Sequence, residues 1–324
     1  MWFRVPETIK ISLKNRLPEG VYAKDLALWI MGMLREENVA YKSLEFHGEG
    51  VPALSIADRM TLANVTAEMG LKSAAFPPDD KLADYFGDYA VQGVWADRDA
   101  MYYKEFEVDL AQVIPLVMEV GEINEIKAPG EWGRLEIQQG LIGACASGRL
   151  EDLRVVARIL DGKKIASGFQ LSIVPASREI YLQAIQEGII DRLVKSGASI
   201  LGSSCGPCLG SSHMIMADTR RFITTVNSNS MRRLSAIGVE KYVASPATVA
   251  MTALTGVLTV EVERTDAKYP YWEMPKVWVT VNEFERRYHN RVWNYGDLNS
   301  IACEQLFDEA CTYRIAPDNF KAIQ

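Results

Sequence analysis

Hydrophobic positions near the start of the chain recur first at strand spacing and then at helix spacing. Ile9, Ile11 and Leu13 alternate with polar residues, which predicts a strand. Beyond a turn at residues 18–20, apolar residues three and four positions apart predict an amphipathic helix over 23–37. Similar patterns predict four more elements: a strand over 41–46, a helix over 60–69 ended by Gly70, a short helix with a polar loop over 81–100, and an edge strand over 102–110.

Helix and strand patterns alternate more regularly further along the chain. Residues 149–160 place apolar side chains at helical spacing, and residues 169–174 form a strand pattern. Two more helices are predicted over 177–186 and 189–195, each followed within two residues by glycine. Such alternation predicts an α/β fold in which helices cover a parallel sheet.

Domain boundaries are predicted where these patterns change. The first domain is expected over residues 1–118 and the second over 119–262. Residues 263–324 differ in character, because tyrosine and tryptophan recur through them. We expect this extension to be a packing or assembly surface rather than a cofactor site.

Composition and charge narrow the classes of function. Hydrophobic residues make up 48% of the chain and charged residues 24%, as in a globular protein, and no apolar run approaches the roughly 20 residues that span a membrane. The formal net charge of −7 argues against nucleic-acid or anionic-membrane partners and favours a small-molecule partner. The start of the chain has no apolar signal segment, and five cysteines do not form a disulfide framework, so a cytoplasmic protein is expected.

Three cysteines in glycine-rich surroundings are the candidate metal ligands. Cys205 and Cys208 form a Cys-x-x-Cys pair, and Cys145 lies in a separate stretch of small residues. Both motifs are expected on loops beyond the carboxyl ends of parallel strands, where they can meet. An iron–sulfur cluster, a zinc site completed by His213, and a redox dithiol all fit this pattern. Cys303 and Cys311, eight residues apart in the extension, are assigned no function.

Several motifs in order resemble the aconitase superfamily, and within it the branch of 3-isopropylmalate dehydratase and homoaconitase large subunits. The resemblance covers about residues 3–257. The matching stretches are 2–10, 54–68, the first cysteine loop at 143–153, Cys205-Gly-Pro-Cys-Leu-Gly, and 244–250. It implies that residues 1–118 and 119–262 are the three-layer second and third domains of that family.

The resemblance also implies a role for each matching residue. Cys145, Cys205 and Cys208 would ligate a 4Fe-4S cluster with one open iron. Asn64 and Glu68, four positions apart, stand where the family places polar groups near that iron. In the segment 225–233, Asn227 matches a cluster-contacting asparagine and Arg233 a substrate-carboxylate arginine.

The sequence departs from the family pattern at several positions. Ser228 replaces an active-site arginine, and Ala146 and Ser147 replace the family's Thr-Asn. The family's first domain and the full swivelling domain have no match in this sequence. We therefore expect the iron–sulfur subunit of a split hydro-lyase, part of a hetero-oligomer, that acts on a hydroxy carboxylic acid while partner chains supply those domains. The alternative is a non-catalytic iron–sulfur or zinc-binding module for assembly or iron sensing.

Overall fold

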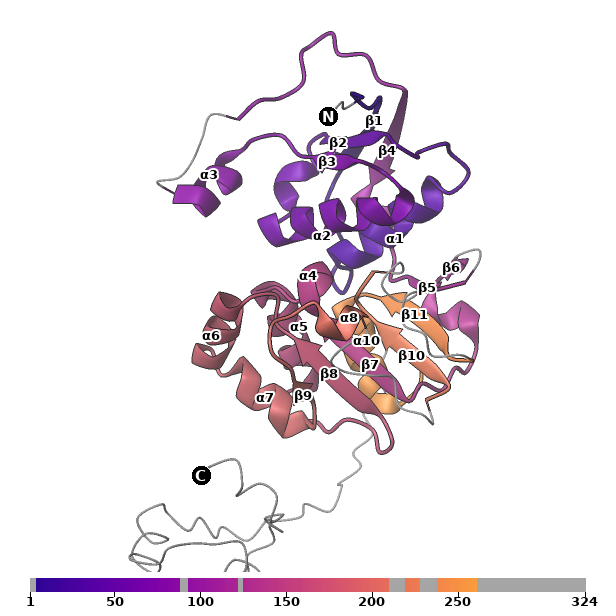
Figure 1. Ribbon diagram of the computed structural model, residues 1–324, viewed down its shortest axis with the longest axis vertical. Coiled ribbons are helices and arrows are strands. Elements are labelled where there is room, and N and C mark those ends of the chain that lie inside the picture. The colour runs from indigo at the N-terminus through magenta and orange to yellow at the C-terminus, as the bar shows by residue number, and fades with distance from the viewer. Residues whose placement is uncertain (1–3, 88–92, 122–124, 210–218, 228–237, 261–324) are drawn as a thin grey trace, which may run out of the picture. The chain divides into compact units, whose positions relative to one another are not determined.

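A four-stranded parallel sheet, in the order β3-β2-β1-β4, is the framework of the first part of the chain (Figure 1). The strands are β1 (Thr8–Lys14), β2 (Ser43–His47), β3 (Ser73–Ala75) and β4 (Lys104–Asp109). In β1 the alternate residues Ile9, Ile11 and Leu13 are fully buried, which confirms the strand predicted from their spacing. The predicted edge strand is also confirmed, because β4 lies at one end of this sheet.

Two longer helices and several short ones accompany this sheet. They are α1 (Ala23–Met33), α2 (Ile56–Thr66) and α3 (Asp80–Phe86), with 3₁₀ turns η1 (Val51–Ala53), η2 (Ala67–Met69) and η4 (Leu110–Gln112). The predicted bounds of two helices were wrong. α1 ends at Met33 rather than 37, where the chain turns and buries Leu34 in the core. α2 begins at Ile56 rather than 60, because Ser55 and Asp58 form a capping box that starts it earlier.

A seven-stranded sheet, in the order β6-β5-β11-β10-β7-β8-β9, is the framework of the second part. The strands are β5 (Val117–Glu119), β6 (Glu125–Lys127), β7 (Gln139–Gly143), β8 (Gln170–Val174), β9 (Ser199–Ile200), β10 (Arg221–Thr224) and β11 (Glu240–Ala244). Strands β11, β10, β7, β8 and β9 are parallel, whereas β5 and β6 pair antiparallel at one edge. The prediction of largely parallel sheets is confirmed.

Most helices of the second part follow a strand directly. They are η5 (Pro129–Trp132), α4 (Ala144–Ser147), α5 (Leu150–Leu160), α6 (Arg178–Gln186), α7 (Ile189–Ser196), α8 (Gly206–Leu209) and α10 (Pro246–Thr255). The predicted bounds of α5, α6 and α7 agree with these to within one residue. Gly197 ends α7 in the left-handed conformation, as its position in the sequence indicated.

One hydrophobic core joins the four-stranded sheet to one face of the seven-stranded sheet. It runs from Ile9 and Leu26 to Leu141, Val174 and Cys208. A second core covers the other face, between that sheet and α5, α7 and α10. Cys208 therefore belongs to the core that the two parts share.

The computed structural model describes residues 4–87, 93–121, 125–209, 219–227 and 238–260, all within one compact unit. The predicted extension over 263–324 lies outside them, and the domain boundaries at 118 and 262 stay predictions. Among the described residues, no helix has the length and apolar character needed to cross a membrane.

Candidate functional site

The first cysteine follows a sharp turn at the end of β7. Gly143 has a φ of 121° and Ala144 a φ of 55°, so the chain leaves the strand through two residues with positive φ. The turn is tight, because a Cβ on Gly143 would lie 2.0 Å from the carbonyl oxygen of Val174 in β8. Cys145 comes next, in the single turn of α4, and its side chain is exposed. The sequence predicted a loop here, and the structure places the cysteine in a one-turn helix instead.

The second cysteine motif follows β9 on the same edge of the sheet. Cys205 is exposed and precedes α8, whereas Cys208 lies within α8 and is buried. Parallel strands end at a common edge, and β7 and β9 are both neighbours of β8. The strand order therefore supports the expectation that the two cysteine motifs lie at the same edge of the sheet.

Electrostatic interactions link the three thiols. Burial, together with smaller electrostatic contributions from Cys145 and Cys205, raises the pKa of Cys208 to about 12. A buried thiol of this kind stays protonated near neutral pH unless a cation binds its sulfur. Among the described residues, no three His, Cys, Asp or Glu side chains are close enough together to hold a single metal ion. His213, the candidate fourth zinc ligand, lies outside them.

Cys145, Cys205 and Cys208 lie beyond the carboxyl ends of β7 and β9, at an edge of the sheet that we call the cysteine edge. This edge has features that fit an iron–sulfur cluster. Two exposed thiols and one buried thiol follow the ends of β7 and β9, the two strands on either side of β8. The hydroxyl oxygen of Ser203, two residues before Cys205, is buried and has no hydrogen-bond partner among the described residues. A buried hydroxyl donor beside thiolates is the kind of group that stabilises cluster sulfur, which is commonly hydrogen-bonded in proteins.

Two of the predicted polar residues are brought into direct contact. The side-chain nitrogen of Asn227 donates to the side-chain oxygen of Asn64 over 2.7 Å, although the two are 163 positions apart. Asn64 lies in α2, and Asn227 lies just beyond the end of β10, the strand beside β7. Glu68 lies on η2, the 3₁₀ continuation of α2. Arg233 and Ser228 lie outside the described residues.

Hydrogen bonds hold α2 against the loop that carries Cys145. The hydroxyl of Thr61 donates to the carbonyl oxygen of Ala146 over 3.3 Å, and Arg149 donates to the same hydroxyl. At the start of α2, the hydroxyl of Ser55 donates to Glu151 over 2.7 Å. These contacts fix α2, and with it Asn64, relative to the first cysteine.

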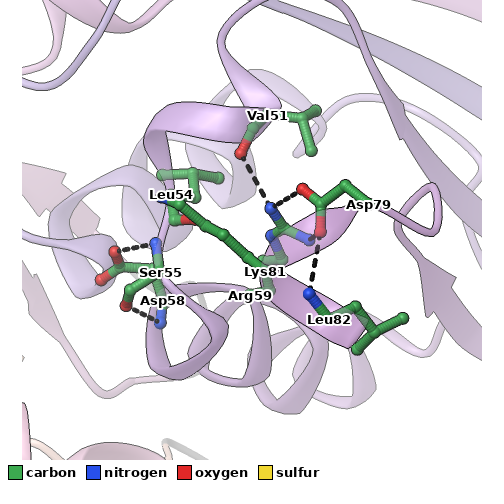
Figure 2. Close-up of polar contacts among 8 residues, drawn as sticks. All are labelled: Val51, Leu54, Ser55, Asp58, Arg59, Asp79, Lys81 and Leu82. Carbon is green, nitrogen blue, oxygen red and sulfur yellow. Dashed lines mark hydrogen bonds and ion pairs between the residues drawn. The ribbon is translucent and has the colours of Figure 1, made fainter. Parts of the chain in front are cut away.

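A buried arginine fastens the start of α2 on its other side, as Figure 2 shows. The guanidinium of Arg59 is 5% exposed, forms a two-pronged pair with Asp79, and donates to the carbonyl oxygen of Val51. Asp79 in turn caps α3 by accepting from the backbone N–H of Leu82. Lys81 donates to the carbonyl oxygen of Leu54. These contacts hold the amino end of α2 in place. Asn64 lies in the same helix, near its carboxyl end.

Lys24, a buried cation of this site, was not among the residues predicted from the sequence. Lys24 is 2% exposed, and its ammonium donates to the side-chain oxygen of Asn227 over 3.3 Å. Burial lowers the pKa of Lys24 to about 8, against the opposing influence of Glu68 and Cys145. One feature of the sequence pointed to Lys24. A positive charge in the first turn of a helix is unfavourable because of the helix dipole, so a lysine at this position indicates a compensating interaction elsewhere.

A cavity of about 500 Å³ lies beside Lys24, where the amino ends of α1, α2 and α5 meet. Asp58 and Asp152 line it together with Lys24. Burial raises the pKa of Asp152 to about 6, and a hydrogen bond from the backbone N–H of Arg149 opposes this rise. The cavity thus brings together ionisable groups of both signs next to the polar residues of the site.

The sequence matches a known family over most of its length. The model of the aconitase family (aconitate hydratase) matches residues 1–121 and 119–256. The chain belongs to the aconitase family, and the resemblance drawn from its motifs is confirmed.

Several curated relatives in one branch of that family are similar to the chain. It is 41% identical to the 3-isopropylmalate dehydratase large subunit of Clostridium beijerinckii over 80% of this chain and 62% of the relative. It is 39% identical to the 3-isopropylmalate dehydratase large subunit 2 of Archaeoglobus fulgidus, over 79% of this chain and 62% of the relative. It is also 39% identical to the probable methanogen homoaconitase large subunit of Methanosarcina mazei, over 80% of this chain and 66% of the relative.

The chain spans only 62% to 66% of the length of these relatives. Among solved structures, Thermococcus kodakaraensis aconitase X (holo-form) aligns with 15% identity and a TM-score of 0.43, over 72% of this chain and 52% of that one.

Proposed function

We propose that this chain is the iron–sulfur subunit of a hydro-lyase that adds water to, or removes it from, a hydroxy carboxylic acid. The main support is the convergence of the cysteine edge with the hydrogen-bonded pair Asn64 and Asn227. The relatives' names, 3-isopropylmalate dehydratase and homoaconitase large subunits, agree with this class of reaction.

Cys145, Cys205 and Cys208 would hold a 4Fe-4S cluster. When bound by three thiolates, such a cluster supplies an open iron that acts as a Lewis acid on a substrate hydroxyl. The chain's own polar residues would then orient the substrate. Asn64 and Asn227 offer amide donors beside the cysteine edge, and Glu68 offers a carboxylate that can accept or hold a proton.

Substrate recognition would depend in part on Arg233. A guanidinium binds a carboxylate through two parallel hydrogen bonds, whereas an ammonium cannot. The hydroxyl of Ser228 cannot form this pair of hydrogen bonds. We therefore propose a substrate with fewer carboxylates, or with different ones, than a chain with arginine at both positions would bind.

Further catalytic groups would come from partner chains. Several relatives are named as large subunits, which implies a separate small subunit in those enzymes. We propose that this chain also works in a hetero-oligomer, with partners that supply the equivalents of the first and swivelling domains. The cytoplasmic location stays a prediction.

Metal analysis tests the cofactor directly. Anaerobically purified protein should contain about four irons and four sulfides per chain, and Cys205→Ser should abolish them. Cys303→Ser is the matched control, because it removes a cysteine to which no function is assigned, and it should leave the iron content unchanged. Stoichiometric zinc without sulfide would instead favour the non-catalytic module.

Activity with and without partners tests the rest of the proposal. The isolated, iron-loaded chain should show no hydro-lyase turnover, and activity should appear when co-purifying chains are added. Losing a positioned acid or base typically costs about 10²- to 10⁴-fold in rate. Robust turnover by the pure chain would refute the need for partners, because its base would then have to lie within these 324 residues.

A further inference from the structure

Lys24 begins a chain of hydrogen bonds that crosses the candidate site. Its ammonium donates to the side-chain oxygen of Asn227 over 3.3 Å, and the side-chain nitrogen of Asn227 donates to the oxygen of Asn64 over 2.7 Å. The three residues come from α1, α2 and the segment after β10. The bonds therefore link elements that are far apart in the sequence.

The chemistry of the ammonium gives this chain of bonds a direction. A lysine ammonium has three donors and no acceptor, so the oxygen of the Asn227 amide must face Lys24. The nitrogen of that amide then faces Asn64, which must present its own oxygen in return. As a result, the two N–H donors of Asn64 point away from Asn227. Without Lys24, nothing in this trio would distinguish one orientation of the Asn227 amide from its flipped form.

We propose that Lys24 is a positioning residue that sets the orientation of Asn227 and, through it, of Asn64, so that Asn64 presents N–H donors rather than an oxygen to its surroundings. This inference rests on the proposed function only for the use made of those donors. Developing negative charge on a substrate oxygen, or sulfur at the cysteine edge, would be stabilised by fixed N–H donors and repelled by an amide oxygen.

The surroundings of Lys24 support a functional rather than a purely structural role. Its interactions with Glu68, Cys145, Asp152 and Asp25 are all attractive. A buried cation is costly to desolvate unless nearby groups compensate it, and the thiolates of a loaded cysteine edge would add further negative charge. Lys24 is thus placed where the site would need positive charge.

Side-chain amide exchange in the metal-free full chain tests the orientation directly. The side-chain amide signals of Asn64 and Asn227 can be assigned in an ¹⁵N-labelled sample from Asn64→Asp and Asn227→Asp variants. In Lys24→Met, hydrogen exchange of both amides should be at least about tenfold faster than in the wild type, because the bond that holds Asn227 is lost. Lys24→Arg keeps donors at this position and should restore most of the protection.

The matched control is Lys42→Met, which also removes a buried lysine. Lys42 is 7% exposed and pairs with Glu7 over 2.7 Å, beside the four-stranded sheet. Its loss should leave the exchange of the two amides unchanged. Equal acceleration in Lys42→Met and Lys24→Met would overturn the proposal, because both effects would then reflect general loosening. Unchanged exchange in Lys24→Met would overturn it as well.

Lys24→Gln keeps the proposal testable if Lys24→Met does not fold. A glutamine amide can donate or accept, so it cannot fix the orientation of Asn227. Asn64 should then show two sets of side-chain signals, or one averaged set with faster exchange. A single, protected set would contradict the positioning role.

Iron retention measures what the orientation does for the site. In the loaded chain, Lys24→Met and Asn64→Asp should each lose iron several-fold faster in air, and the double variant no faster than the worse single one, since both act through the same donors. Additive losses would show that Lys24 does not act through Asn64. A wild-type chain that binds no iron would refute the proposed function alone, because the amide exchange is measured without metal.

Discussion

The turn at Gly143 allows a quantitative test of how the fold places Cys145. Alanine there would have to adopt a φ of 121° and a ψ of −132°, a region reserved almost entirely for glycine. Backbone strain of this kind costs about 1–3 kcal/mol. The new Cβ would also lie 2.0 Å from the carbonyl oxygen of Val174, whereas such contacts essentially never fall below 3.0 Å. β7 and β8 would therefore have to separate locally by about 1 Å.

That separation would weaken the pairing of Gly143 with Val174 at the end of the two strands. Losing one such hydrogen bond costs about 0.5–1.5 kcal/mol, so we expect Gly143→Ala to lower the free energy of unfolding by about 2–4 kcal/mol. Urea unfolding followed by circular dichroism measures this change. Because Cys145 follows two residues later, iron content after reconstitution should also fall sharply.

Two other glycines allow the cost of backbone strain to be separated from the cost of the close contact with Val174. Gly162 has a φ of 66° and open space around its missing Cβ, so Gly162→Ala should cost only the strain, about 1–2 kcal/mol. Gly130 has neither a positive φ nor a close neighbour, and Gly130→Ala should be nearly neutral. If Gly143→Ala destabilised the protein no more than Gly162→Ala, the close approach to Val174 would not limit this turn.

Three further predictions concern buried and charged groups. Arg59→Met breaks the pair with Asp79 and should cost about 2–3 kcal/mol in urea unfolding, a loss that should shrink in acid because Arg59 lowers the pKa of Asp79. Burial raises the pKa of Asp25 to about 7, so the folded state holds a proton that the unfolded chain releases near about pH 4. The free energy of unfolding should therefore fall as pH rises from about 4 to 7, and Asp25→Asn should flatten this fall, measured as urea unfolding against pH. Arg233→Lys should weaken substrate affinity in the assembled enzyme without changing iron content or melting temperature.

The elements were predictable where local pattern and burial agree. Alternating Ile9, Ile11 and Leu13 are all buried, and the apolar residues of α5 face the second core as their spacing indicated. The start of α2 was missed although Ser55 and Asp58 carry the signature of a capping box. Apolar spacing alone indicated a start at Met60, whereas the cap decides where the helix begins.

Other features depend on tertiary structure alone. The short antiparallel strands β5 and β6 carry too few residues for a periodic signal, and they form because β11 offers an edge. Lys24 belongs to the first turn of a helix, where a charged residue is ordinarily solvated. Only the packing of α1 against the site encloses its ammonium and gives it Asn227 as a partner. No spacing in the sequence carries that information.

The meeting of Asn64 with Asn227 shows why motif order identified the family but could not by itself build the site. Asn227 and Cys145 follow β10 and β7, which are neighbours, and the second cysteine motif follows β9, one strand beyond β8. This strand order, rather than distance along the chain, gathers the three segments at one edge. α2 is held at the same edge by the bond from Thr61 to Ala146, and near its amino end by the pair of Arg59 with Asp79. The candidate site therefore depends on strand order and on one helix held in place, so changes at Arg59 or Thr61, which lie outside the cysteine motifs, should alter the iron content expected from the proposed cluster.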